Sequence, residues 1–103
     1  MNYPRTFRND LYSLLQKYPK DLTVYYNHYG DMDTFKPFFV IKDDILYLSQ
    51  STDDFGNGLK VGELIELLKS ASDKNIEVST YYDFANGHKD YHCNMPIDLI
   101  YFK

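Results

Sequence analysis

The sequence predicts an α+β protein, in which two similar αβββ halves form one mostly antiparallel sheet with two helices packed on one face. Three observations favour this class: two leucine-rich helical stripes, strand-like segments that follow each stripe, and an offset at which the halves match. A length of 103 residues fits a single domain, residues 1–103. We expect its halves at residues 6–50 and 59–103, joined by a loop at 51–58.

The two halves resemble each other along their length. Three pairs of segments match in the same order: 10–17 with 63–70, 22–24 with 76–78, and 44–48 with 98–102. The offset is 53 residues for the first pair and 54 for the other two. A regular offset of this kind indicates repeated supersecondary units. Neither half has enough residues to form a stable fold readily by itself. We therefore expect both halves to share one core.

Each half begins with a predicted helix. Thr6 or Asn9 is a candidate N-cap for the first helix, and Gly62 lies near the start of the second. Pro19 should end the first helix, because the residue before a proline avoids helical backbone. The apolar stripes, at the spacing of one helix face, are Leu11, Leu14, Leu15 and Tyr18 in the first half and Val61, Leu64, Leu67, Leu68 and Ala71 in the second.

Three strands are expected after each helix. Asn86-Gly87 is a strong hairpin signal in the second half, and Gly30-Asp31 supplies a turn in the first. Pro37 implies that its strand starts late or lies at an edge of the sheet, because proline cannot donate to a ladder. The expected strands are 22–29, 35–41 and 45–49 in the first half, and 76–84, 88–95 and 99–102 in the second.

Composition and charge exclude several classes of protein. The single cysteine, Cys93, cannot form an internal disulfide, and the longest apolar run, Phe38–Ile41, is far too short to span a membrane. With no apolar run near its N-terminus, the chain is expected to be cytoplasmic and free of membrane contact. Its net charge of −4 lies between Asp31 and Asp54, where six aspartates outnumber two lysines. Direct nucleic-acid binding is disfavoured, and a basic or nucleic-acid-handling protein is the expected partner.

The segment that could carry chemistry is His88 to Cys93. His88, Asp90 and His92 project from one face of a strand, and imidazoles with a carboxylate are ligands for zinc or non-haem iron. Alternate residues on a strand lie about 6.6–6.8 Å apart, so a further strand would have to supply a ligand. His28 is the remaining histidine. A polar, solvent-facing strand explains the same pattern, and we expect neither a metal nor another cofactor.

Tyrosine is abundant, with 11 in the chain, and this exceeds what a core needs because a buried hydroxyl requires a partner. If Val24 and Tyr26 face inward, their neighbours lie on the outer face of the sheet. Surface tyrosines and acidic turns suit protein interfaces, although tyrosine also favours strands without any partner. The expected partner-binding residues are Tyr25, Tyr29, Asp31, Asp33, Asp43, Asp44, Asp53, Asp54, Tyr81 and Tyr91.

The function that follows is a non-enzymatic protein–protein interaction module. In size and in its lack of catalytic signatures the chain is similar to small phage or mobile-element accessory proteins as a class. Many of those, anti-CRISPR inhibitors included, bind and inhibit or adapt a host protein. Two alternatives remain open: a metal-dependent or small-ligand enzyme that uses His88, Asp90 and His92, and a structural homodimer that pairs through an exposed aromatic sheet face.

Overall fold

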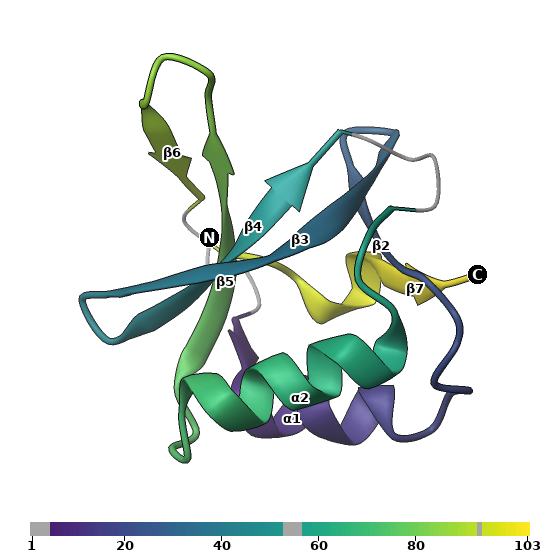
Figure 1. Ribbon diagram of the computed structural model, residues 1–103. Coiled ribbons are helices and arrows are strands. Elements are labelled where there is room, and N and C mark those ends of the chain that lie inside the picture. Colours follow the sequence, from purple (N-terminus) through teal and green to yellow (C-terminus); the bar gives the residue numbers. More distant parts are fainter. Residues whose placement is uncertain (1–4, 53–56, 93) are drawn as a thin grey trace.

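The computed structural model describes residues 5–52, 57–92 and 94–103 of the chain. Asp53, Asp54 and Cys93 lie outside the described residues. Figure 1 shows the arrangement of the elements, which occur in the order β1 (Thr6–Phe7), α1 (Arg8–Leu15), β2 (Val24–His28), β3 (Asp31–Lys42), β4 (Ile45–Ser51), α2 (Val61–Ala71), β5 (Glu77–Asp83), β6 (Lys89–Tyr91), the 3₁₀ helix η1 (Ile97–Leu99) and β7 (Ile100–Phe102).

The strands form one mixed sheet of seven strands, in the order β1-β5-β4-β3-β2-β7, with β6 attached to β5. β4 and β5 run parallel, because α2 carries the chain back between them, and the other five pairings among the described residues are antiparallel. α1 and α2 lie next to each other on one side of the sheet, whereas the β5–β6 hairpin projects away from both (Figure 1). The predicted α+β class is confirmed.

The predicted duplication is not confirmed by the strand pairing. Each half does contain a helix followed by three strands. At the offset of 54 residues, however, β2 corresponds to β5 and β4 corresponds to β7. The β4–β5 pair is parallel and the corresponding β7–β2 pair is antiparallel, so exchanging the two halves does not reproduce the sheet.

The N-terminus of α1 is capped by a distant segment and not by the predicted residues. Phe7 occupies the N-cap position without a side-chain cap. The Asn9 backbone N–H donates to Asn75 Oδ1 at 2.9 Å, and the Arg8 N–H donates to the Ile76 carbonyl at 2.8 Å. Thr6 belongs to β1, where its buried hydroxyl donates to the carbonyl of Met95. The helix therefore begins where the pairing of β1 with β5 ends. The local sequence around residue 8 does not reveal this position.

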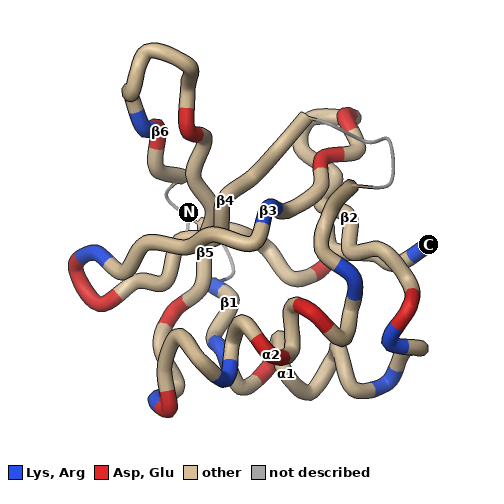
Figure 2. The backbone as a smooth tube through the Cα atoms, viewed as in Figure 1, with Lys and Arg blue, Asp and Glu red and all other residues tan. Residues whose placement is uncertain are grey.

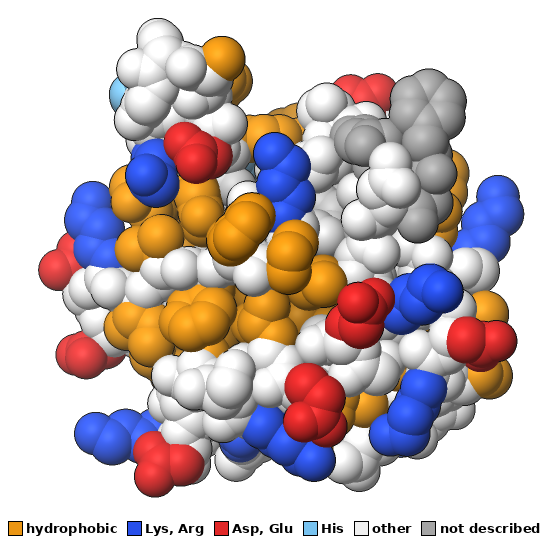
Figure 3. All heavy atoms as spheres, in the orientation of Figure 1, with side chains coloured by type: hydrophobic (Ala, Val, Ile, Leu, Met, Phe, Trp, Pro, Cys, Tyr) orange, Lys and Arg blue, Asp and Glu red, His pale blue; other side chains and the backbone are white. Residues whose placement is uncertain are grey.

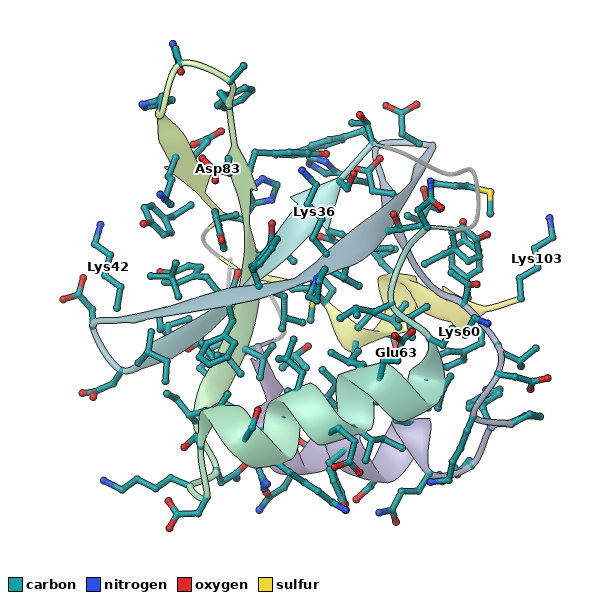
Figure 4. All side chains as sticks on the ribbon, viewed as in Figure 1. Lys36, Lys42, Lys60, Glu63, Asp83 and Lys103 are labelled. Carbon is teal, nitrogen blue, oxygen red and sulfur yellow. The ribbon has the colours of Figure 1, made fainter. Side chains whose placement is uncertain are left out.

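α2 follows the predicted stripe closely. It begins after Lys60, whose backbone N–H donates to the Glu63 carboxylate at 3.0 Å (both labelled in Figure 4). A carboxylate in the first turn also interacts favourably with the positive end of the helix dipole.

Among the described residues, no helix has the length and apolar character needed to cross a membrane.

One apolar core lies between the two helices and the sheet. The predicted stripes supply its helical side, although Tyr18 falls beyond the end of α1 and is 41% exposed. Burying each large aliphatic side chain contributes roughly 1.5–3 kcal/mol. The fully buried members include Leu11 and Leu15 from α1, Val61, Leu64 and Leu68 from α2, and Val24, Phe35, Leu46, Leu48 and Val78 from the sheet.

Gly58 holds the segment before α2 against β3. A Cβ atom added at this position would lie 2.9 Å from Thr34 Cγ2 and still closer to Thr34 Cβ, so the two residues would clash. One residue later, the Leu59 N–H donates to the Phe35 carbonyl at 2.8 Å. The close approach that Gly58 permits therefore fixes the path of the chain into α2.

We expect Gly58→Ala to lower the free energy of unfolding by about 1–3 kcal/mol, because a fully packed site must move to admit the methyl group. Gly62→Ala is the matched control: the atoms nearest to its Cβ belong to Lys20, of which Cβ would lie at 3.2 Å and the carbonyl oxygen at 3.4 Å, and alanine favours the helix. Urea denaturation followed by circular dichroism measures both. Equal stability of the Gly58→Ala and wild-type proteins would contradict the described packing.

Candidate functional site

A groove of about 850 Å³ opens between the β5–β6 hairpin and the turn that joins β2 to β3. Its walls come from β2, the end of β5, β6 and the segment that leads into η1. Most of the lining side chains are aromatic or imidazole rings. The lining residues that matter below are His28, Tyr29, Tyr82, Phe84, Asp90, Tyr91 and His92.

The layer of side chains beneath the groove continues the face of the sheet that the helices cover. Along β4, Leu46 and Leu48 are core residues and Gln50 is the next side chain on the same face. In the parallel register Gln50 lies beside Tyr82, and on its other side it pairs with Phe35 of β3. Asp33 precedes Phe35 by two residues and shares its face. Three adjacent strands thus deliver polar groups to one point beyond the helices.

These groups form a buried hydrogen-bond network around one carboxylate. Asp33 is 2% exposed, and its Oδ2 atom accepts hydrogen bonds from the Tyr82 hydroxyl and from Gln50 Nε2, the latter at 2.6 Å. Gln50 Nε2 also lies 2.9 Å from the Tyr82 hydroxyl. Removing a carboxylate from water is costly unless donors replace the water, and these two side chains supply them.

The same network leaves one acceptor unused. Because Gln50 points its amide nitrogen at Asp33, its Oε1 atom is buried without a hydrogen-bond partner in the described structure. Leaving a buried acceptor unpaired costs about 1–3 kcal/mol. Departures of this kind from optimal packing are concentrated at functional sites.

Two histidines connect the network to the groove. His28 Nδ1 lies 3.2 Å from Gln50 Nε2, 3.3 Å from the Tyr82 hydroxyl and 3.7 Å from Asp33 Oδ2. Because Nδ1 faces the network, Nε2, on the other side of the ring, faces away from it. The ring of His92 lies with its centroid 4.8 Å from that of His28 and 5.4 Å from that of Tyr82.

Burial and charge set the protonation states of two of these groups. The pKa of His92 is lowered, first by burial and then by repulsion from His28. The pKa of Tyr82 is raised, by burial and by the hydrogen bond and negative charge of Asp33. At neutral pH, His92 is therefore neutral and Tyr82 keeps the proton that it donates to Asp33.

The charge around the groove is negative. Asp90 lines it, Asp33 lies beneath it, and the charge of Asp31 also acts on Tyr82. No lysine or arginine is among the described residues that line the groove. The arrangement suits a cationic or neutral ligand better than an anion.

The structure brings part of the sequence-predicted set into this groove. Tyr29 stands at the β2–β3 turn with a positive φ of 53° and is 95% exposed. Asp90 and His92 line the opposite wall, and Tyr91 borders it, although its ring packs against Tyr81 on the outer face of the sheet. These four residues come from two predicted groups, the tyrosine surface and the histidine cluster, that the sequence did not join.

Tyr81 and Asp33 are not on the surface, contrary to expectation. Tyr81 does lie on the outer face of the sheet, but it is only 3% exposed because β6 pairs with β5 and places the ring of Tyr91 5.7 Å from its own. Tyr47 packs edge-on against Tyr91 and closes the same cluster. Asp33 is buried because it belongs to the inward face of β3, which extends farther toward its N-terminus than the predicted strand.

The remaining partner-binding candidates do not form one surface. Asp31 lies at one end of β3 and Asp43-Asp44 at the other, and Figure 2 shows acidic residues at both of these ends. Tyr25 is half-buried on β2 and stacks on Tyr101, with ring centroids 5.8 Å apart. Asp53 and Asp54 are outside the described residues.

The candidate metal ligands His88, Asp90 and His92 do not come together on β6. His88 is exposed beyond the groove and stacks on Phe84 at 5.8 Å, while His92 turns toward His28. In the part of the chain that the structure describes, no group of three histidine, cysteine, aspartate or glutamate residues could hold a metal ion.

Sequence reasoning missed the site residues Tyr82, Phe84 and Gln50, and a usable signal existed for Gln50. The available signal was its spacing, since it continues the buried positions Leu46 and Leu48 at an interval of two. A polar residue at a buried position requires a buried partner, but only the pairing of β4 with β5 identifies Tyr82 as that partner.

Comparisons with known proteins give no relative from which a function could be inferred. No family model matches the chain. Searches of curated proteins and of solved structures give no significant match. The chemistry of the groove is therefore the basis for a functional proposal.

We expect Tyr82→Phe to lower the free energy of unfolding by about 1.5–3 kcal/mol, because it removes a donor from a buried carboxylate. Tyr25→Phe is the matched control: the same atom is removed from a half-buried ring that stacks on Tyr101, and the change should stay within about 0.5 kcal/mol. Urea denaturation measures the free energy of unfolding of both variants. Equal losses in the two variants would show that the Asp33–Tyr82 hydrogen bond adds nothing to stability.

Stability should fall as the pH is lowered from 7.5 to 5.5. The pKa of His92 is below 6.5 in the folded protein and returns to its ordinary value on unfolding, so the unfolded chain binds the proton first. His92→Gln should reduce this loss of stability, whereas the exposed His88→Gln should leave it unchanged. Urea denaturation at several pH values gives the slope, and an unchanged slope in His92→Gln would contradict the described burial.

Proposed function

We propose that the protein is a non-enzymatic interaction module whose groove binds a cationic side chain, lysine or arginine, of a protein partner. The observation that carries this proposal is the composition of the groove: aromatic rings and carboxylates line or underlie it, and no described lysine or arginine lines it. The proposal keeps the basic partner expected from the sequence and assigns its contact to a particular place.

Aromatic rings support a cationic ligand. Tyr29 on one wall and Tyr82 and Phe84 on the other present ring surfaces to the groove, and Phe84 is 48% exposed. A guanidinium or ammonium group over such rings gains about 0.5–2 kcal/mol, with more gain where water is excluded. Tyrosine and phenylalanine are also enriched at the centres of protein interfaces.

The charge distribution supports the same ligand. Asp90 is exposed in the groove and can pair directly with a cation, whereas Asp33 is covered by its donors and acts only through its field. A phosphate or carboxylate would meet like charge here without an arginine or lysine to bind it. Arginine fits best, because its planar group stacks on rings while it donates to a carboxylate.

The class of partner follows from this chemistry. A protein rich in exposed arginine or lysine, such as one that handles nucleic acid, would present the required side chains. This is in keeping with the similarity in size and character to phage and mobile-element accessory proteins that bind host proteins. The chain would then act by occupying a basic surface of its partner.

Binding of short peptides tests the proposal. We expect a peptide of alternating arginine and glycine to bind and a peptide of alternating glutamate and glycine not to bind, as measured by isothermal titration calorimetry. Asp90→Asn should weaken the binding about tenfold, and Tyr29→Ala should weaken it about threefold to tenfold. Raising the salt concentration should weaken it further, because exposed charges are screened.

Asp43→Asn is the matched control for Asp90→Asn. It makes the same change of charge in an exposed turn that does not line the groove, and asparagine tolerates the positive φ of 53° found there. Equal weakening by both substitutions would mean that only net charge matters. The absence of arginine-peptide binding at millimolar concentration would refute the proposed ligand.

A further inference from the structure

β3 carries a stretch of open edge. β2 pairs only with residues 31–33 of β3, and the chain before α2 covers Phe35, whose carbonyl accepts the Leu59 N–H. Beyond that point, residues 36–42 make no backbone hydrogen bond outside the β3–β4 ladder to any other described residue. An unpaired strand edge is a template for another strand.

The side chains of this stretch are apolar and exposed. Phe38 is 62% exposed, Ile41 47% and Phe39 38%. Figure 3 shows a band of hydrophobic side chains above α2, where β3 passes across the molecule. Proteins usually protect such edges, so an apolar strand left open indicates a binding surface.

Turn geometry settles which backbone groups point outward. Asp43 and Asp44 both have positive φ, 53° and 62°, as in a two-residue type I′ turn closed by the hydrogen-bonded pair Lys42 and Ile45. Pairs alternate along an antiparallel ladder, so the N–H and C=O of Val40 also face β4. Those of Phe39 and Ile41 face outward.

We propose that this edge pairs antiparallel with the same edge of a second copy of the chain, about a two-fold axis at Val40. Phe39 then lies opposite the partner's Ile41, and the two residues exchange both backbone N–H···O bonds. By symmetry, Ile41 does the same with the partner's Phe39. Phe39 and Ile41 of the two copies become cross-strand neighbours on one face, and Phe38 and Val40 lie on the other face.

Charge complementarity favours a second copy over another strand. Centring the pair at Val40 brings the Lys36 end of each strand toward the Asp43-Asp44 turn of the other copy, so the aspartate turn of each copy meets the lysine of the other. Lys36 and Lys42 extend from the two ends of the open stretch in Figure 4, and Figure 2 shows the acidic turn beyond it. Lys42 is already held over the ring of Tyr91, at 4.4 Å from its centroid, which leaves Lys36 to pair with the turn.

Irregularity at the other end of the stretch limits the length of the pairing. The register of β3 against β4 shifts between Phe35 and Phe39, and Pro37 has no N–H to donate. Regular pairing with the second copy is therefore confined to the residues that follow Pro37 in β3. Because an isologous pair uses the same edge of both copies, it closes and cannot continue into a fibre.

Sedimentation velocity over a range of concentrations tests the proposal on the intact chain. We expect a monomer–dimer equilibrium at micromolar to millimolar concentration. Lys36→Glu should raise the dissociation constant at least about tenfold, because it places like charges opposite each other at both ends of the pair. Ile41→Lys should abolish the dimer. A wild-type protein that remains monomeric at millimolar concentration would overturn the proposal.

A disulfide cross-link tests the register. Val40 faces its own copy across the axis at a position without hydrogen bonds, where the Cα atoms lie about 4.5 Å apart, which is within the disulfide range. In a Cys93→Ser background, Val40→Cys should therefore form a covalent dimer on mild oxidation. Ser13→Cys, on the exposed face of α1, is the control and should cross-link far more slowly.

The outcomes separate this inference from the proposed groove. A dimer in which Val40→Cys cross-links no faster than Ser13→Cys pairs through another surface, and this would refute the β3 edge. Rapid cross-linking together with the effect of Lys36→Glu supports it. Peptide binding in the groove should be unaffected by Lys36→Glu, because Lys36 does not line the groove.

Discussion

The parallel pairing of β4 with β5 is the constraint on which the rest of the structure depends. It joins the two halves of the chain, and it requires α2 to cross over the sheet between the two strands. The register that it sets places Leu46 beside Val78 in the core and Gln50 beside Tyr82 beneath the groove. The apolar core and the polar network are consequently two stretches of one face of the sheet.

The polar network exists because the helices cover only part of that face. Where α1 and α2 lie over the sheet, Leu46, Leu48 and Val78 belong to one apolar core with the leucines of both helices. Beyond the helices, the same face would be exposed to water but for the β5–β6 hairpin and the segment that leads into η1. Asp33 is buried there with two donors, and the rings that cover it form the walls of the groove.

The groove and the open edge of β3 make separate use of one long strand. Near its start, β3 is paired on both sides and supplies Asp33 to the interior. After Asp33 it no longer pairs with β2, because the Leu59 backbone comes between Val24 and Phe35, and farther along it exposes Phe38 and Ile41. Pro37 lies between the two stretches and has no N–H to donate to a neighbouring strand. The groove suits a charged side chain, and the open edge of β3 suits another strand.

Local sequence determined the elements, and tertiary structure determined their pairing. Apolar spacing predicts both helices, and alternation predicts most strands, because these patterns reflect which side of an element meets the core. The same patterns made both halves look equivalent, although β4–β5 is parallel and β7–β2 is antiparallel. The sequence also marked Tyr29, Asp90 and His92 as candidates. It could not show that β6 covers Tyr81 or join Asp33 to Gln50 and Tyr82, because strand order depends on contacts between distant segments.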